Sequence, residues 1–382
     1  AMALALLGAP ALAQQTDAQS QADADNGIGE IIVTAQRSET KLQDTPLSIV
    51  AVGAAQLERQ GTDSLAGFDT FVPNVTIGGT AAQGNAIVNV AIRGIGGAPQ
   101  GFITQEGSVG IYVDDILFAR PNGALLDLLD VERVEVLRGP QGTLFGRNTA
   151  GGAIRYVTKQ PGSELAGSIK VTAGQRDRFD VQSMLNLPLG DTLAARFSFA
   201  KKSRNGFIHR IVDNSTVGDE NSTTMRGQLR WQPTERLDIG LSADLIRTSD
   251  NGQPSTSTNF SPTDLYPTQL YGVTVAGDPP PSPAAFNSLR ATAPLSVSPS
   301  GYTNAAADFA SYYGQIKGKY EIYGGLQPDL NKFKSYGLTG TIAYELTDNL
   351  TVKSLTGYRN IKQIQNQDWD RTPIPLVQLN DT

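Results

Sequence analysis

The chain of 382 residues contains no cysteine and a single histidine, His209. Without thiols it cannot form disulfides, and one histidine cannot supply a Cys/His metal cluster. We therefore expect no metal site and a solvated loop position for His209. The formal net charge is -6, and no basic stripe offsets it, which argues against nucleic acid as a partner.

Long apolar runs are missing as well. No stretch of about 18 or more apolar residues occurs, so a membrane-spanning helix is excluded. Membrane-spanning β-strands are not excluded, because each needs only about 9–11 residues of alternating polarity.

Nucleotide-binding motifs also fail. The stretch "VEVLRGPQGTLFGRNTAGGAI" (134–154) lacks the Gly-Lys-Ser/Thr of a phosphate loop. In "IRGIGGAPQG", Pro99 stands where a dinucleotide fingerprint needs its third glycine. We therefore expect no cofactor, and we expect these glycines to serve tight turns and close packing of the backbone.

The N-terminal residues indicate export. Residues 1–13, "AMALALLGAPALA", resemble the remnant of a signal peptide, with a short buried helix as the alternative. Residues 14–40 begin with "QQTDAQSQADADNG", which is too polar to fold, and we interpret this segment as a disordered tail.

Residues 162–382 alternate between apolar and polar side chains, as strands with one apolar face do. Tight turns such as "LPLGDTL", "WQPTERL" and "YELTDNL" join pairs of strands, whereas the connections near 203–222 and 250–331 are long. Short turns at one rim and long loops at the other are typical of an outer-membrane barrel, and a soluble β-sandwich is the alternative.

Residues 41–161 have a different character. Helix-like pieces such as "GAAQLERQ" are mixed with strand-like pieces such as "GIYVDD", "RVEVLRG" and "AIRYVTK". This mixture predicts a compact α+β domain ahead of the alternating strands.

The order "GEIIVTAQR", "TPLSIVAV", "VAIRGIG", "GIYVDDI" and "DVERVEVLRGPQGTLFGRNTAGGAIRYVTKQP" resembles the TonB-dependent receptors, above all those of the iron-complex or siderophore type. The resemblance implies an α+β plug domain inside an antiparallel transmembrane β-barrel, which in this family has 22 strands and a plugged lumen. It also implies a multi-pass protein of the Gram-negative outer membrane, surrounded by outer-membrane lipid, that is not an enzyme.

The resemblance assigns roles to several residues of the plug. Arg93, Glu132 and Arg138 are candidates for ion pairs that hold the plug to the barrel wall or to itself, with solvated turn charges as the alternative. The glycines expected at tight turns or close contacts are Gly94, Gly139, Gly142, Gly146, Gly151 and Gly152.

The same resemblance implies a TonB box, the segment that pairs as an added strand with the energy-transducing protein TonB. The matching residues are Glu30, Ile31, Ile32, Val33, Thr34 and Ala35. A β-branched run in a disordered tail suits strand addition, because its backbone groups are free.

The expected function is TonB-dependent import of a bulky nutrient, in the first place a ferric siderophore. Import of an oligosaccharide or cobalamin and a binding-only surface protein are alternatives, and the ligand-binding residues are unknown. Seven tyrosines of the second long loop are candidates for stacking on a ligand: Tyr266, Tyr271, Tyr302, Tyr312, Tyr313, Tyr320 and Tyr323. A glycan hydrolase has no support, because Asp114 and Asp115 are adjacent on an expected strand and would point to opposite faces.

The number of strands departs from the family. We expect about seven barrel strands here, so the chain is interpreted as the N-terminal part of a longer receptor that cannot close a barrel alone.

Ile32→Pro tests the TonB box. Proline removes a backbone donor and fixes φ, so we expect uptake to be abolished while ligand binding persists. Uptake and binding of labelled ligand by cells measure the two, and unchanged uptake would refute the assignment.

Overall fold

The computed structural model describes residues 32–33, 40–61, 65–70, 72–78, 89–96, 106–118, 129–210, 214–251, 321–322, 330–368 and 378–381. Expectations for residues 1–13 and for most of 14–40 lie outside this part, as do the seven loop tyrosines. No described helix is long and apolar enough to cross a membrane.

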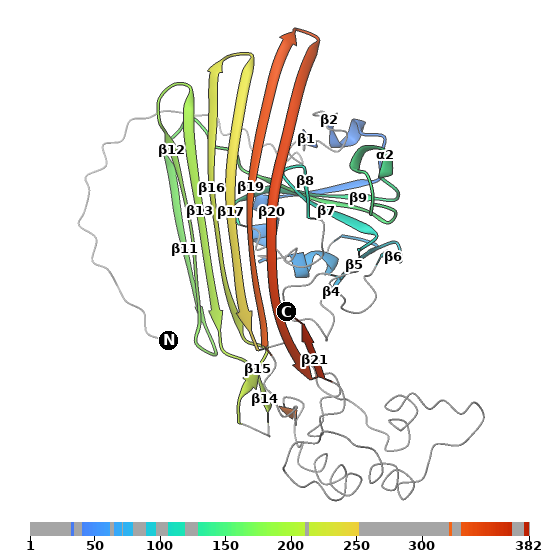
Figure 1. Cartoon of the computed structure of the whole chain (residues 1–382), viewed down its shortest axis with the longest axis vertical. Helices are drawn as coiled ribbons and strands as arrows, with labels where there is room; N and C mark the ends of the chain where they lie inside the picture. The colour runs from blue at the N-terminus through green and yellow to red at the C-terminus, as the bar shows by residue number, and fades with distance from the viewer. Residues whose placement is uncertain are drawn as a thin grey trace, which may run out of the picture.

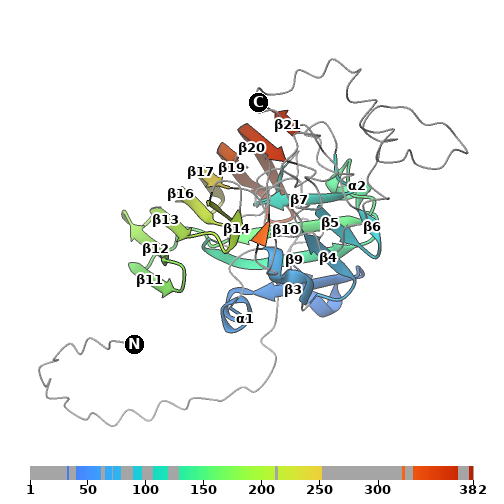
Figure 2. The ribbon, with the colours of Figure 1, turned by 90° about the horizontal axis from the view of Figure 1, so that it is seen from below.

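Two bodies make up the described structure. Residues 40–158 form an inner domain, and residues 166–381 contribute a long sheet that curves around one side of it (Figures 1 and 2). The inner domain lies on the concave face of this sheet, in the place where the family resemblance puts a plug.

The inner domain is built on a sheet of five strands in the order β3-β9-β10-β7-β8. The bounds are β3 Ile49–Gly53, β7 Val109–Val113, β8 Ile116–Phe118, β9 Val131–Arg138 and β10 Gly152–Thr158. Strands β10 and β7 are parallel, and the other pairs are antiparallel. Their β-branched runs read as fully buried strands, and Val134, Val136 and Ile154 are completely buried.

Smaller elements complete the inner domain. The helices are η1 Leu42–Asp44, α1 Ala54–Arg59, η2 Leu65–Thr70 and α2 Gly142–Phe145. A second sheet contains β4 Val75–Gly78, β5 Asn89–Ile92 and β6 Ile95–Gly96, and β1 Ile32–Val33 pairs with β2 Thr40–Lys41.

The long sheet is antiparallel, with eight strands in the order β11-β12-β13-β16-β17-β19-β20-β21. Their bounds are β11 Ala166–Gly174, β12 Arg178–Pro188, β13 Leu193–Arg204, β16 Glu220–Thr234, β17 Leu237–Asp250, β19 Leu330–Thr347, β20 Leu350–Asp368 and β21 Gln378–Asp381. The described sheet thus exceeds the expected seven strands by the short β21, whose sequence has no alternating pattern to mark it.

The turns between these strands follow the sequence-based expectation. Tight turns join β12 to β13, β16 to β17 and β19 to β20 at one rim (Figure 1). At the other rim, β13 and β16 are separated by the short strands β14 Ile208–Arg210 and β15 Thr216–Val217, and β14 also pairs with β18 Glu321–Ile322. His209 therefore lies on a strand and not in a loop, which corrects the expectation.

Gly152 shows why glycine is needed where β10 begins. Its φ is +146°, and a Cβ at this position would lie 2.2 Å from the Leu137 carbonyl oxygen on the paired strand β9. At Gly151 a Cβ would lie 2.5 Å from the Ile95 oxygen. The strand can therefore enter the sheet here only without side chains.

Replacing Gly152 tests this close approach. In Gly152→Ala, the strained φ and the backbone clash should destabilise the inner domain by roughly 3 kcal/mol. Gly142→Ala is the matched control, because a Cβ there meets no atom within 4 Å, and its effect should stay within ~0.5 kcal/mol. A brief protease pulse measures the unfolded fraction, and equal cleavage of the two variants would contradict the explanation.

Candidate functional site

The candidate site is the contact between the inner domain and the concave face of the long sheet. Three aspartates of the inner domain, Asp114, Asp115 and Asp130, meet cationic side chains of the long sheet there. All three aspartates have positive φ, between 47° and 68°, which Asp tolerates better than most residues. The turns therefore aim carboxylates at the sheet.

Asp114 and Asp115 are the two central residues of the hairpin that joins β7 to β8. Positive φ at both positions is the signature of the type I′ turn that matches strand twist. The expectation that they lie on a strand with opposite facings is therefore wrong, because the chain reverses direction at this point.

Asp130 makes the most buried contact of the site. Arg196 on β13 binds it through two hydrogen bonds, Nε to Oδ2 at 2.5 Å and Nη2 to Oδ1 at 2.6 Å, and the Ser198 hydroxyl donates to Oδ2 at 2.7 Å. The two charged side chains are only 5% and 8% exposed. A pair of this kind is strong only because both groups are fully hydrogen-bonded.

The Asp130 contact also reaches the linker that leads from β10 to β11. Arg196 contacts Asn186 at 3.5 Å, and the Asn186 side chain bonds the backbone of Gly162 through both its oxygen and its nitrogen. It also donates to the Glu164 carbonyl. The linker is therefore fastened to the sheet beside Asp130.

Asp114 connects the hairpin tip to β16. Its carboxylate accepts hydrogen bonds from Arg226 Nη1 at 3.0 Å and from the backbone N–H and hydroxyl of Thr158 at 2.9 and 2.8 Å. Gln228 in turn donates to the Thr158 hydroxyl at 3.2 Å. The end of β10 is therefore part of the same network.

Asp115 lies at the end of a chain of charges that runs through the inner domain. Arg133 contacts Glu135 at 2.8 Å, Glu135 contacts Arg155 at 2.5 Å, and Arg155 contacts Asp115 at 2.5 Å. Lys353 on β20 closes the chain with a contact of 3.4 Å to Asp115. Glu135 and Arg155 are 0% and 3% exposed, so the network penetrates the core of the domain.

Burial would raise the pKa of the Asp115 carboxyl, but Arg155 and then Lys353 lower it more, and the net pKa lies below its ordinary value of 3.8. Asp115 is therefore ionised near neutral pH. Burial raises the pKa of the Tyr156 hydroxyl well above its ordinary value, so this group stays neutral.

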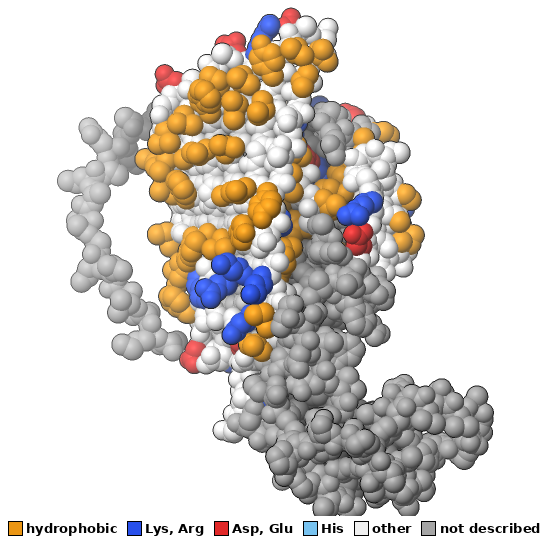
Figure 3. Space-filling model, viewed as in Figure 1, with side chains coloured by type: hydrophobic (Ala, Val, Ile, Leu, Met, Phe, Trp, Pro, Cys, Tyr) orange, Lys and Arg blue, Asp and Glu red, His pale blue; other side chains and the backbone are white. Residues whose placement is uncertain are grey.

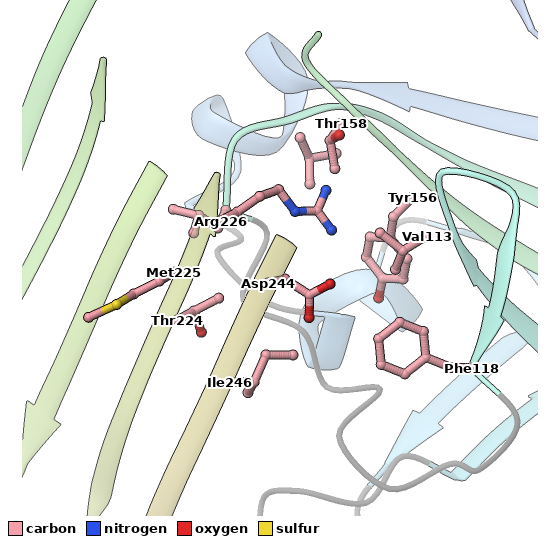
Figure 4. A pocket seen from close by; sticks show the side chains of 11 residues that line it. Val113, Phe118, Tyr156, Thr158, Thr224, Met225, Arg226, Asp244 and Ile246 are labelled. Atoms are coloured by element: carbon pink, nitrogen blue, oxygen red, sulfur yellow. The ribbon is translucent and has the colours of Figure 1, made fainter. Parts of the chain in front are cut away.

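A small cavity of about 30 Å³ lies in the contact (Figure 4). Its lining comes from both bodies: Val113, Phe118, Leu129, Val131, Tyr156 and Thr158 from one, and Thr224, Met225, Arg226, Asp244 and Ile246 from the other. It has room for about one water molecule, and the Tyr156 hydroxyl has no partner among the described residues. Two of the lining residues also contact Arg359 on β20, which binds Asp244 at 2.7 Å and stacks 4.0 Å from the centre of the Phe118 ring.

The charged residues singled out in the sequence lie elsewhere. Arg93 donates to the Ser48 hydroxyl at 3.0 Å, within the inner domain. Glu132 pairs at the surface with its neighbour Arg133. The Nε of Arg138 has no hydrogen-bond partner among the described residues. In the described structure none of these three residues bridges the two bodies. The carboxylates that do so belong to Asp114, Asp115 and Asp130, which lie in turns.

The glycines divide into those with unusual geometry and one without. Positive φ occurs at Gly94, Gly139, Gly146 and Gly152, and Gly151 makes a close backbone contact. Gly142 opens α2 and shows neither feature.

Of the expected TonB box, the structure describes only Ile32 and Val33. They pair with Lys41 and Thr40, and the Val33 side chain is fully buried. Glu30, Ile31, Thr34 and Ala35 lie outside the described residues. The expectation that the backbone groups of this segment are free is therefore wrong for Ile32 and Val33, which pair with β2. No group of three or more Asp, Glu or His residues in the described part is placed to hold a metal.

The sequence alone missed the residues that build the contact. Asp114 and Asp115 had a usable signal, since two aspartates between apolar β-branched runs fit a two-residue hairpin turn. The arginines had no such signal, because the sequence does not distinguish one inward-facing polar residue of a barrel strand from another.

Comparisons with known proteins agree with this architecture. Residues 41–153 match the family model described as the TonB-dependent receptor plug domain. The chain is 30% identical over 246 residues to the pesticin receptor of Yersinia enterocolitica and 26% identical over 238 residues to the ferrioxamine B receptor of Salmonella typhimurium. The matched segments cover 63% and 59% of this chain but 35% and 32% of those proteins. The chain thus spans about a third of the length of these relatives.

A solved structure shows the same fold. The ferric yersiniabactin uptake receptor of Yersinia pestis superimposes with a TM-score of 0.63 at 19% identity, covering 84% of this chain and 42% of that one.

Arg196→Ala tests the buried ion pair. It leaves Asp130 buried without its partner, so we expect the inner domain to lose about 3–5 kcal/mol against opening. Arg236→Ala is the control, because the Arg236 pair with Asp348 is 56% and 90% exposed and should contribute almost nothing. Protease cleavage within residues 106–158 reports the opening, and equal cleavage of both variants would overturn this view.

Acid should weaken the Asp115 contacts at a defined pH. A carboxyl whose pKa falls on folding stabilises the folded state fully above its unfolded value, near 3.8, and loses this contribution as pH falls through the lowered value. We expect the hairpin contact to be unchanged between pH 7 and 5 and to loosen below about pH 4. Current across a lipid bilayer that holds the full-length receptor carrying this chain measures this, with Asp115→Asn as a variant that should lack this component.

Proposed function

Because this chain belongs to the TonB-dependent receptors, we propose that it takes part in the active import of a bulky nutrient, a ferric siderophore in the first place, across the outer membrane. The inner domain is the plug, and the long sheet is part of the barrel wall. Relatives named for pesticin and ferrioxamine B and a neighbour named for ferric yersiniabactin uptake support the substrate class.

The observation that carries the proposal is the polar contact between plug and wall. An import path through a plugged barrel requires the plug to rearrange. Asp130, Asp114 and Asp115 hold the plug through charge-assisted hydrogen bonds, which water can replace when the surfaces separate. Arg359 and Phe118 add a stacking contact.

The apolar core lies mainly in the plug and continues into the wall. Its largest buried cluster includes Phe68, Ile92 and Ile154, with Ile246 and Phe333 as contributions from the wall. The apolar core is thus concentrated inside the plug, while the contact with the wall is rich in ion pairs. This distribution supports movement of the plug, or of part of it, without loss of its whole fold.

The energy input that we propose is a pull on the TonB box, Glu30 to Ala35. Within this segment the only described pairing is the two-residue ladder between β1 and β2. So short a ladder is easily exchanged for a strand of TonB, which offers the same backbone hydrogen bonds. Ligand docking would expose the box, and the pull would then rearrange the plug.

The proposed organisation of the chain follows. Residues 1–13 are a signal-peptide remnant, 14–40 a tail that carries the box, 41–161 the plug and 162–382 barrel strands. The alternatives are import of an oligosaccharide or of cobalamin by the same mechanism, and a surface protein that binds without transport.

Energy-dependent uptake separates these functions. Cells with and without the receptor would be given radioactive iron bound to a panel of siderophores, before and after a protonophore collapses the inner-membrane potential. We expect accumulation only with the receptor and only with the potential intact, while surface binding persists in both. Binding that never leads to accumulation, for siderophores, cobalamin and oligosaccharides alike, would favour the surface protein and refute transport.

A further inference from the structure

The outward face of the long sheet has a boundary between an apolar band and a group of basic side chains. In Figure 3 the hydrophobic side chains cover most of this face, and Lys and Arg gather near its lower end. The exposed apolar residues include Phe197, Leu229, Leu241, Leu338 and Ile342. Such a band is the part of a barrel wall that faces lipid tails.

Strand register places the basic side chains in one row. Lys201 on β13 is opposite Thr223 on β16, and Thr223 is opposite Arg247 on β17. Arg247 is in turn opposite Lys334 on β19, and Lys334 is opposite Lys362 on β20. Four of five adjacent strands thus contribute a cation at the same level.

This row is costly for the sheet taken alone. Like charges directly opposite each other on neighbouring strands lie about 5 Å apart and repel. Arg247, Lys334 and Lys362 are exposed, and none forms an ion pair with another residue in the part of the chain that is described. Lys332 adds a further exposed cation one pleat away. An external anion bound at the row would relieve this repulsion.

The level of the row fits a lipid headgroup. Tyr336 lies one pleat from the row on the apolar side, and Tyr358, opposite Leu338, lies one pleat further, with ring centres 6.2 Å apart. Tyr344 lies near the other end of the band on the same strand, eight residues further on, which is about 26 Å along the strand and about 20 Å along the membrane normal at the usual strand tilt. Aromatic residues flank the hydrocarbon layer in outer-membrane barrels. The cations thus stand just beyond the tails, where phosphates lie.

The rim of the sheet that is nearer to the row indicates which lipid leaflet the row faces. The row lies toward the ends of β13 and β17 that lead into the long connections, away from the tight turns. Long connections face outward in such barrels. We propose that Arg247, Lys334 and Lys362, flanked by Lys201, form a binding site for the headgroup phosphates of outer-leaflet lipid.

The test uses the full-length receptor that carries this chain, reconstituted in nanodiscs of phosphatidylglycerol and phosphatidylcholine with identical acyl chains. Native mass spectrometry counts the lipids retained after release into mild detergent. Wild type should retain phosphatidylglycerol preferentially. The triple variant R247Q/K334Q/K362Q should lose this preference by about fivefold for each charge removed, on the order of 100-fold in relative affinity.

Two control variants isolate the charge and its position. R247K/K334R/K362R keeps three cations on the same strands and should retain the preference, which shows that loss in the Gln variant is not misfolding. R236Q removes one exposed cation at the opposite rim and should have no effect on it. Sodium chloride at about 0.5 M should weaken retention in wild type through screening.

Three results would overturn the proposal. The first is that wild type shows no preference for phosphatidylglycerol. The second is that the Gln triple variant retains this lipid as well as wild type does. The third is that excess inorganic phosphate displaces the lipid completely. The last result would mean that the row selects free phosphate and not lipid. The readout is lipid retention and not transport, so this test is independent of the import assay.

Discussion

The buried pair between Asp130 and Arg196 is the constraint on which the arrangement of the two bodies depends. An aspartate beside a buried strand has little access to water, and its charge is tolerable only with a partner that satisfies both oxygens. That partner is supplied by the wall, at the point where Asn186 also fastens the linker. The plug and the first wall strands therefore satisfy each other's buried hydrogen-bonding and charged groups.

Charge is distributed asymmetrically across this contact. The carboxylates belong to turns of the plug, and the cations belong to the interiors of long wall strands. The positions of the cations are therefore set by strand pairing, whereas the carboxylates lie where the chain turns with positive φ. The outward face of the same strands is organised differently, with the apolar band and the row of cations set by strand register alone.

Local patterns of the sequence predicted the local structure well. Alternation with period two located the wall strands, and turn residues located the tight turns, because both signals lie within a few neighbouring residues. The contact between the bodies was beyond reach for the opposite reason. Asp114 and Arg226 are 112 positions apart, and no short-range pattern marks one as the partner of the other. Arg93, Glu132 and Arg138 stood out by resemblance, yet the structure places none of them at that contact.

The fastening of the linker has a mechanical consequence. Gly162 and Glu164 are held by Asn186 at the C-terminal end of the plug, while a pull on the tail would act at its N-terminal end. A body anchored at one end and drawn at the other swings about its anchor and is not carried away. In the proposed import cycle, this anchor would keep the turns of the inner domain close to their partners on the sheet after each pull.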